Sequence, residues 1–106
     1  MLSETQIQAL IDEIVQGYQP DKVYLFGSYA THAASKDSDV DLFIVKSTKS
    51  RKIDRSKEVR QSIKTYPLIG LDIIVYTPEE FELAQKDIVN IGREAVTNGK
   101  LMYERV

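Results

Sequence analysis

The 106-residue sequence has no cysteine, no tryptophan and a single histidine, His32. The absence of cysteine excludes disulfides, thiol catalysis and cysteine-bound zinc, and it fits a reducing compartment, so we expect a cytoplasmic protein. A Ser-His-Asp triad would have to use His32, and little else in the sequence supports such a triad. The chemistry of this protein is therefore expected to depend on other side chains.

A strong charge imbalance and long apolar runs are also missing. The 14 basic and 16 acidic residues leave a net charge of −2, so no overall field attracts nucleic acid, and direct nucleic-acid binding is not expected. No signal-peptide pattern and no membrane-spanning apolar run is present, so no association with a membrane is expected. The length suggests a single domain over residues 1–106.

The N-terminal segment has the pattern of an amphipathic helix. Ser3 and Gln6 have the spacing of a capping box, which opens a helix. Apolar residues at helical spacing continue from there to Tyr18. Gly17 and Pro20 predict where this helix ends.

Three apolar segments and one shorter segment predict strands. They cover residues 23–26, 40–45, 71–76 and 101–103. The segment 40–45 is apolar on both faces, so we expect a central strand there.

A second helix start follows the third of these segments. Thr77 is a suitable cap, Pro78 suits the first helical position, and Glu80 completes a capping box. Apolar residues, among them Ile88, Val89, Ile91, Ala95 and Val96, then predict helical structure that ends near Gly99.

The segment between the second and third predicted strands is basic. Residues 46–64 hold eight of the fourteen basic residues and only two acidic ones. Ile53, Val59 and Ile63 form a thin apolar stripe, which predicts a helix with a basic outer face. Tyr66-Pro67 and Gly70 are expected to break it. The basic face could simply be solvated, dock an acidic partner, or contact a triphosphate or nucleic acid.

Gly27 and Ser28 follow the first predicted strand directly. A tight glycine turn after a strand can hold phosphate groups, and Ser28 is expected to cap a short helix. Such a pair taken alone is better explained as a turn with a helix cap than as a functional site. The acidic residues that follow in the sequence decide between a phosphate-binding turn and a simple helix cap.

Three aspartates farther along the sequence favour the phosphate-binding interpretation. Asp39 and Asp41 are two apart at the start of a strand, so both point to one face, about 7 Å apart along the backbone. Like charges this close disfavour each other's ionisation, and Mg²⁺ would remove that conflict. Asp72 lies in another apolar strand, and if that strand is adjacent, Asp72 could join the same site or accept a proton from an attacking hydroxyl. The combination favours a metal-and-phosphate site over acids that only cap or pair.

The pattern of Gly27-Ser28, ten residues, Asp39-Val40-Asp41 and a downstream Asp72 resembles the DNA polymerase β-like nucleotidyltransferase superfamily, and most of all its minimal members. The resemblance implies an α/β (α+β) fold with a mixed β-sheet flanked by helices. It implies that Gly27 and Ser28 touch the nucleotide phosphates. Asp39 and Asp41 would bind two Mg²⁺ ions, and Asp72 would help bind one and activate the acceptor hydroxyl.

Minimal nucleotidyltransferases commonly work beside a HEPN toxin, and some transfer AMP from ATP to a tyrosine of that toxin. The resemblance therefore implies an adenylyltransferase antitoxin. Two alternatives are a non-catalytic antitoxin that masks its partner, and transfer of a nucleotide to a small molecule such as an aminoglycoside. A domain this small leaves its site open on one side, so a partner or a homodimer is expected.

One position departs from the family pattern. Members often have Arg-Gly where this chain has Thr31 and His32. The change removes a bidentate phosphate donor, which bears on triphosphate affinity and leaves the acid triad intact. Lys36 or a basic residue of the segment 46–64 could replace that donor.

Overall fold

The computed structural model describes residues 2–35, 38–64, 70–86, 92–93 and 98–105. The helices are α1 (Glu4–Tyr18), α2 (Lys52–Gln61) and α3 (Pro78–Ala84). The strands are β1 (Lys22–Phe26), β2 (Val40–Val45), β3 (Leu71–Tyr76) and β4 (Lys100–Glu104), and a 3₁₀ turn, η1 (Gly27–Tyr29), follows β1.

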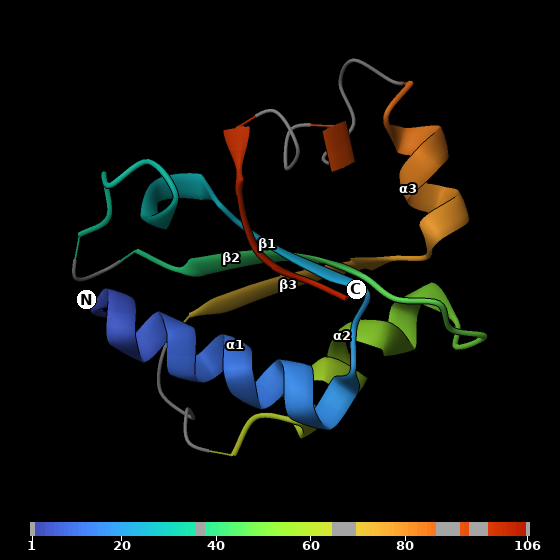
Figure 1. The fold of residues 1–106 in the computed structure, drawn as a ribbon, viewed down its shortest axis with the longest axis horizontal. Coiled ribbons are helices and arrows are strands. Elements are labelled where there is room, and N and C mark those ends of the chain that lie inside the picture. The colour runs from blue at the N-terminus through green and yellow to red at the C-terminus, as the bar shows by residue number, and fades with distance from the viewer. Residues whose placement is uncertain (1, 36–37, 65–69, 87–91, 94–97, 106) are drawn as a thin grey trace.

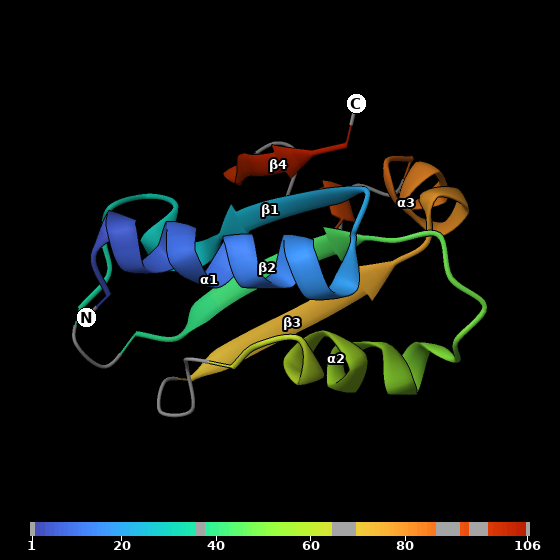
Figure 2. The same cartoon turned by 60° about the horizontal axis from the view of Figure 1, so that its bottom comes forward.

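The strands form one mixed sheet in the order β3-β2-β1-β4 (Figure 2). β2 runs parallel to β3, whereas β1 is antiparallel to both β2 and β4. β2 is therefore an inner strand, as its apolar sequence predicts. The helices α1 and α2 cover one face, and α3 lies on the other (Figure 1). The predicted mixed sheet flanked by helices is confirmed.

Alternation along the strands divides the core between the two faces of the sheet. The face under α1 and α2 carries the larger cluster, formed by Ile7, Leu10, Ile11, Ile14, Val23, Leu25, Val40, Leu42, Ile44, Val59, Leu71, Ile73 and Val75. The α3 face carries an aromatic cluster, in which the rings of Phe43 and Tyr76 meet edge to face with their centroids 5.0 Å apart. That cluster leaves the other end of the α3 face, where β2 and β3 begin, for other side chains.

The capping boxes predicted for α1 and α3 are both present, at Ser3 with Gln6 and at Thr77 with Glu80. The prediction that Gly17 ends α1 is wrong. Gly17 lies inside the helix, and Gln19 takes the left-handed conformation with φ of 55°. A β-carbon on Gly17 would come 2.7 Å from the Ser62 β-carbon, so this glycine allows α1 to approach the end of α2.

The predicted apolar stripe on the basic helix is only partly confirmed. Val59 is fully buried, whereas Ile53 is 80% exposed. The buried side chain on this part of the helix is that of Arg55. Its guanidinium donates to the carbonyls of Ser50 and Val75 and to the Glu80 carboxylate, 2.6 Å away. A thin stripe of apolar residues could not show that an arginine would be buried here.

Other basic side chains of the segment 46–64 also serve the fold. The Lys46 ammonium donates to the carbonyls that end α1. Lys52 lies over the Tyr76 ring, 4.4 Å from its centroid, and Arg60 donates to the Leu71 carbonyl at the start of β3. Lys49, Lys57 and Lys64 are exposed. Much of the basic character of this segment therefore stabilises the packing of α2 against the sheet.

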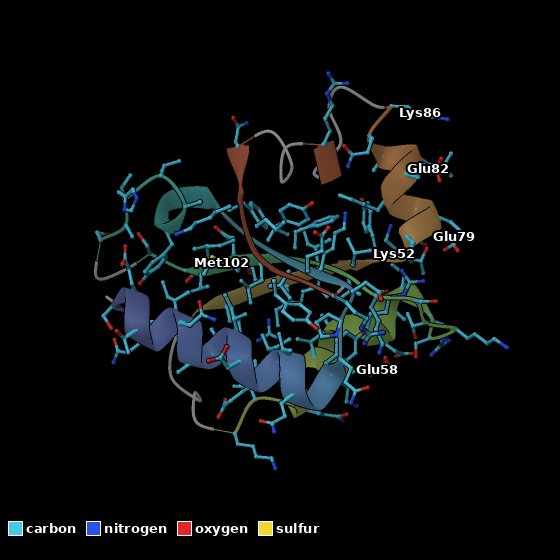
Figure 3. All side chains as sticks on the ribbon, viewed as in Figure 1. Lys52, Glu58, Glu79, Glu82, Lys86 and Met102 are labelled. Atoms are coloured by element: carbon cyan, nitrogen blue, oxygen red, sulfur yellow. The ribbon has the colours of Figure 1, made fainter. Side chains whose placement is uncertain are left out.

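The outer side of α3 is charged. Glu79 and Glu82 are exposed there, on the side of α3 that faces away from the sheet in Figure 3, and the exposed Lys86 follows the end of the helix. Lys36 and the helix break predicted at Tyr66-Pro67 lie outside the described residues, as do the apolar residues predicted to be helical, Ile88, Val89, Ile91, Ala95 and Val96. No helix in the described part of the chain is long and apolar enough to cross a membrane.

Candidate active site

The register of three strands brings the predicted site residues together. Asp41 pairs with Asp72 across the parallel β2–β3 ladder, and with Phe26 across the antiparallel β1–β2 ladder. Because Gly27 follows Phe26, the glycine turn lies directly beside Asp41. Asp41 and Asp72 lie near the starts of β2 and β3, whereas α3 follows the end of β3, so the site is at the end of the sheet away from α3. In Figure 1 this end carries η1, the short teal helix that follows β1.

Asp41 and Asp72 interact directly. Their carboxyl groups are close enough that the protonated form of Asp41 can donate a hydrogen bond to Asp72. Burial raises the pKa of Asp41 to about 6, and the hydrogen bond to Asp72 and the charges of Asp72 and Asp39 add to the rise. A raised carboxyl pKa is a typical consequence of crowding like charges without a cation.

Two glycines make room for these acids. Gly27 has φ of +73°, and a β-carbon on it would overlap the Asp41 carboxylate oxygen Oδ2. A β-carbon on Gly70 would overlap Oδ1 of Asp39. The sequence indicated Gly27 through its turn, whereas Gly70 was expected only to break a helix. Its place beside Asp39 follows from the pairing of β2 with β3, which the sequence alone did not specify.

The site is open to solvent. Asp39 and Asp72 are exposed and Asp41 is half-buried. Although β3 is apolar, only its other face, with Leu71 and Ile73, packs against the helices, so Asp72 is not the buried acid that its strand suggested. Of the three acids, Asp41 is therefore the one whose ionised form is mainly disfavoured by burial.

The carboxylates fit a magnesium site in part. Across the residues that the structure describes, no three acidic or histidine side chains are grouped closely enough to hold a metal ion together. Mg²⁺ needs only one or two protein carboxylates, with water and phosphate oxygens completing its shell. Asp41 and Asp72 supply such a pair, and Asp39 is close enough to affect the pKa of Asp41. The donor set therefore fits a two-carboxylate site with a third acid beside it.

The turn itself differs from its prediction. Ser28 does not cap a helix, because η1 already begins at Gly27, and Phe26 takes the cap position without a side-chain hydrogen bond. Thr31 Oγ1 lies 3.3 Å from the Ser28 carbonyl, to which it donates. His32 is exposed with φ of 60°. Neither residue supplies the bidentate donor that an arginine would place here.

Tyr29 serves packing. Its hydroxyl accepts a hydrogen bond from the Leu2 amide at 3.0 Å, and its ring packs on the core under α1. It also lines a cavity of about 570 Å³ between the start of α1, the η1 segment and β4. Leu25 lines the same cavity, so this hollow lies on the sheet face opposite Asp41 and Asp72. The cavity and the acids are separate features.

Comparisons with known proteins give a consistent result. The family described as "Polymerase beta, Nucleotidyltransferase" matches residues 9–105. A Methanocaldococcus jannaschii protein, provisionally named a protein adenylyltransferase, is 30% identical over 98% of this chain and 76% of its own length. The aligned region is long enough to include the glycine turn and all three acids of this chain.

Two solved structures share the fold. One is described as a nucleotidyltransferase of Sulfolobus solfataricus; it has a TM-score of 0.60 and 22% identity, over 93% of this chain and 78% of that one. The other is described as a toxin-antitoxin with AMP-PNP; it has a TM-score of 0.63 and 19% identity, over 92% of this chain and 73% of that one. At these identities the likeness concerns the fold alone.

Proposed function

This chain belongs to the polymerase beta nucleotidyltransferase family, and we propose that it is a Mg²⁺-dependent adenylyltransferase that transfers AMP from ATP to a tyrosine hydroxyl of a HEPN toxin partner. In this role it is an antitoxin. The observation that carries the proposal is the direct contact of Asp41 with Asp72 beside the Gly27 turn. Acids from two strands meet where a triphosphate could lie along the backbone of the Gly27 turn.

Each residue of the site has a distinct part in the proposed reaction. Gly27 and Ser28 bind the phosphates through the turn, where the absence of a side chain on Gly27 lets the substrate come close. Asp41 and Asp72, with Asp39 beside them, would hold Mg²⁺, two ions in the full complex, and the bound metal would neutralise charge on the phosphate oxygens. The acids otherwise repel the triphosphate, so the metal and the nucleotide are expected to bind together.

The chemical step is an in-line displacement. The acceptor oxygen forms a bond to the α-phosphorus of ATP while the bond to the pyrophosphate oxygen breaks, and pyrophosphate leaves. Asp72 accepts the proton of the attacking hydroxyl in this proposal, and its greater exposure than that of Asp41 supports this role. The contribution of the protein is positioning and electrostatic stabilisation.

A protein acceptor fits the open site better than a small molecule. Asp39 and Asp72 are exposed, and the described chain has no second layer over this end of the α3 face to enclose a small acceptor. The name of the M. jannaschii relative also points to a protein acceptor, and the toxin-antitoxin neighbour supports a toxin as that acceptor. An acceptor domain could complete the open side of the site.

Transfer to the partner tests this function. The protein and the product of the adjacent gene would be incubated with α-labelled ATP and Mg²⁺, and the modified residue would be mapped by mass spectrometry. We expect label on a partner tyrosine with the wild type and none with Asp41→Asn or with EDTA. An unlabelled partner that is natively folded and toxic by itself would refute the proposal.

Masking without catalysis is the second candidate. It is favoured by the absence of a bidentate donor at Thr31-His32 and by the folding of Thr31 back onto the turn. In that case a folded Asp41→Ala variant would still neutralise the toxin. Loss of neutralisation in this variant, with binding to the partner retained, would exclude masking and support catalysis.

A further inference from the structure

Four positions at the start of β2 and β3 form a square on one face of the sheet. Val40 pairs with Leu71, and its amide donates to the Gly70 carbonyl at 2.9 Å. Residues two apart in a strand share a face, so positions 39 and 41 lie beside positions 70 and 72. Three corners carry carboxylates, and the fourth is Gly70.

The missing side chain at this corner has a specific neighbour. The nearest atoms to a β-carbon built on Gly70 all belong to Asp39, beginning with carboxylate Oδ1 and ending with Cβ at 3.3 Å. The Asp39 carboxylate therefore occupies the space that any side chain at position 70 would take.

The backbone does not itself demand glycine at this position. Among the described glycines, Gly27 has a positive φ and Gly70 does not. Alanine could adopt the conformation of Gly70 without the strain of the left-handed region. A turn requirement therefore does not explain Gly70, whereas contact with Asp39 does.

We propose that Gly70 is a positioning residue of the acidic site, which acts by leaving open the space that the Asp39 carboxylate occupies. A methyl group at position 70 would turn Asp39 away from its present place and leave the Asp41–Asp72 contact unchanged. The consequence for cation binding rests on the proposed function, because it assumes that these acids bind Mg²⁺. The consequence for the conformation of Asp39 does not depend on it.

The first measurement therefore needs no metal. Side-chain carboxyl ¹³C resonances of the aspartates would be recorded in EDTA for the wild type and for Gly70→Ala. We expect the Asp39 resonance to move most, that of Asp41 to move less because it senses the Asp39 charge, and that of Asp72 to stay. An unmoved Asp39 resonance in folded Gly70→Ala would overturn the proposal.

The second measurement uses Mn²⁺ alone, by isothermal titration calorimetry. Carboxylates bind Mn²⁺ as they bind Mg²⁺, and a displaced positioning partner typically weakens metal binding on the order of 10-fold. We expect Gly70→Ala to weaken Mn²⁺ binding by that factor when Asp39 is present. In an Asp39→Gly background the same substitution should change Mn²⁺ affinity less than about twofold, because additivity fails for residues that act through each other. An equal loss in both backgrounds would overturn the proposal.

Gly17→Ala is the matched control. It introduces the same methyl group against Ser62 on the other face of the sheet, so it reports general loss of packing. We expect Mn²⁺ affinity to be retained there. If the wild type binds no Mn²⁺, the magnesium part of the proposed function fails, and the carboxyl resonances still decide the role of Gly70.

A rescue experiment covers the case in which Gly70→Ala does not fold. The double variant Asp39→Gly with Gly70→Ala lacks every atom that the added methyl group would meet first. It should fold as well as Asp39→Gly alone. A double variant that also fails to fold would show that Gly70 serves the backbone, and it would overturn the proposal.

Discussion

Replacing Asp41 with asparagine is expected to stabilise the metal-free protein. Burial, the Asp72 hydrogen bond and nearby charge raise the pKa of Asp41 from 3.8 to about 6, so its ionised form is disfavoured in the folded state. A rise of this size corresponds to at most about 3 kcal/mol. Because Asp41 is partly exposed and water screens its interactions, we expect a gain of about 1 kcal/mol at pH 8.

The sign of this effect depends on pH. Below the unfolded pKa of 3.8 the carboxyl is protonated in both states, and the wild type has no disadvantage. As pH rises through about 6, the folded protein must also release its proton, and the stability that came from the protonated form is lost. The advantage of Asp41→Asn should therefore grow between pH 4 and pH 6 and stay constant above that range.

Urea unfolding followed by circular dichroism, in EDTA at several pH values, measures this difference. Asp12→Asn is the matched control, because Asp12 is exposed on α1 and an asparagine keeps the acceptor for the Gln8 side chain. The control should change little with pH relative to the wild type. An Asp41→Asn variant that is less stable than the wild type at pH 8, or a gain that is the same at pH 4, would refute the reasoning.

Three further predictions concern the packing that supports the site. Glu80→Gln should lower the free energy of unfolding by about 2 kcal/mol, because it leaves the buried Arg55 charge without its partner; an unchanged urea midpoint would contradict this. Burial alone would raise the pKa of Glu80, but hydrogen bonds from the Thr77 amide and Arg55 lower it below its ordinary value. The stability that the ionised Glu80 contributes should therefore decrease as pH falls below the ordinary pKa of a glutamate. Gly27→Ala should cost at least about 1 kcal/mol through its positive φ and abolish AMP transfer; full activity would show that the turn does not contact phosphate. Ser3→Ala should cost about 1 kcal/mol in thermal unfolding and leave AMP transfer intact.

The sequence predicted much of this fold because its local signals agree with the tertiary structure. Both capping boxes form, and each apolar segment becomes a strand within one or two residues of its expected bounds. Asp41 and Asp72 were expected to meet only if their strands were adjacent. The parallel pairing of β2 with β3 meets that condition.

The predictions that failed depend on contacts between distant segments. Gly17 lies inside α1 and leaves room for Ser62, and no local pattern shows that contact. Ile53 is exposed, whereas Arg55 is buried against Glu80, which comes from a different helix. The position of Gly70 beside Asp39 likewise depends on the register of β2 and β3, so the sequence alone predicted only that Gly70 breaks a helix.

The most direct test of the account compares α-labelled with γ-labelled ATP, for the wild type and Asp41→Asn, in the presence of Mg²⁺ and the partner. Transfer of AMP predicts that the partner retains the α-label and never the γ-label, and that Asp41→Asn leaves it unlabelled. Retention of the γ-label, or equal α-labelling by Asp41→Asn, would contradict an adenylyltransferase that works through these acids.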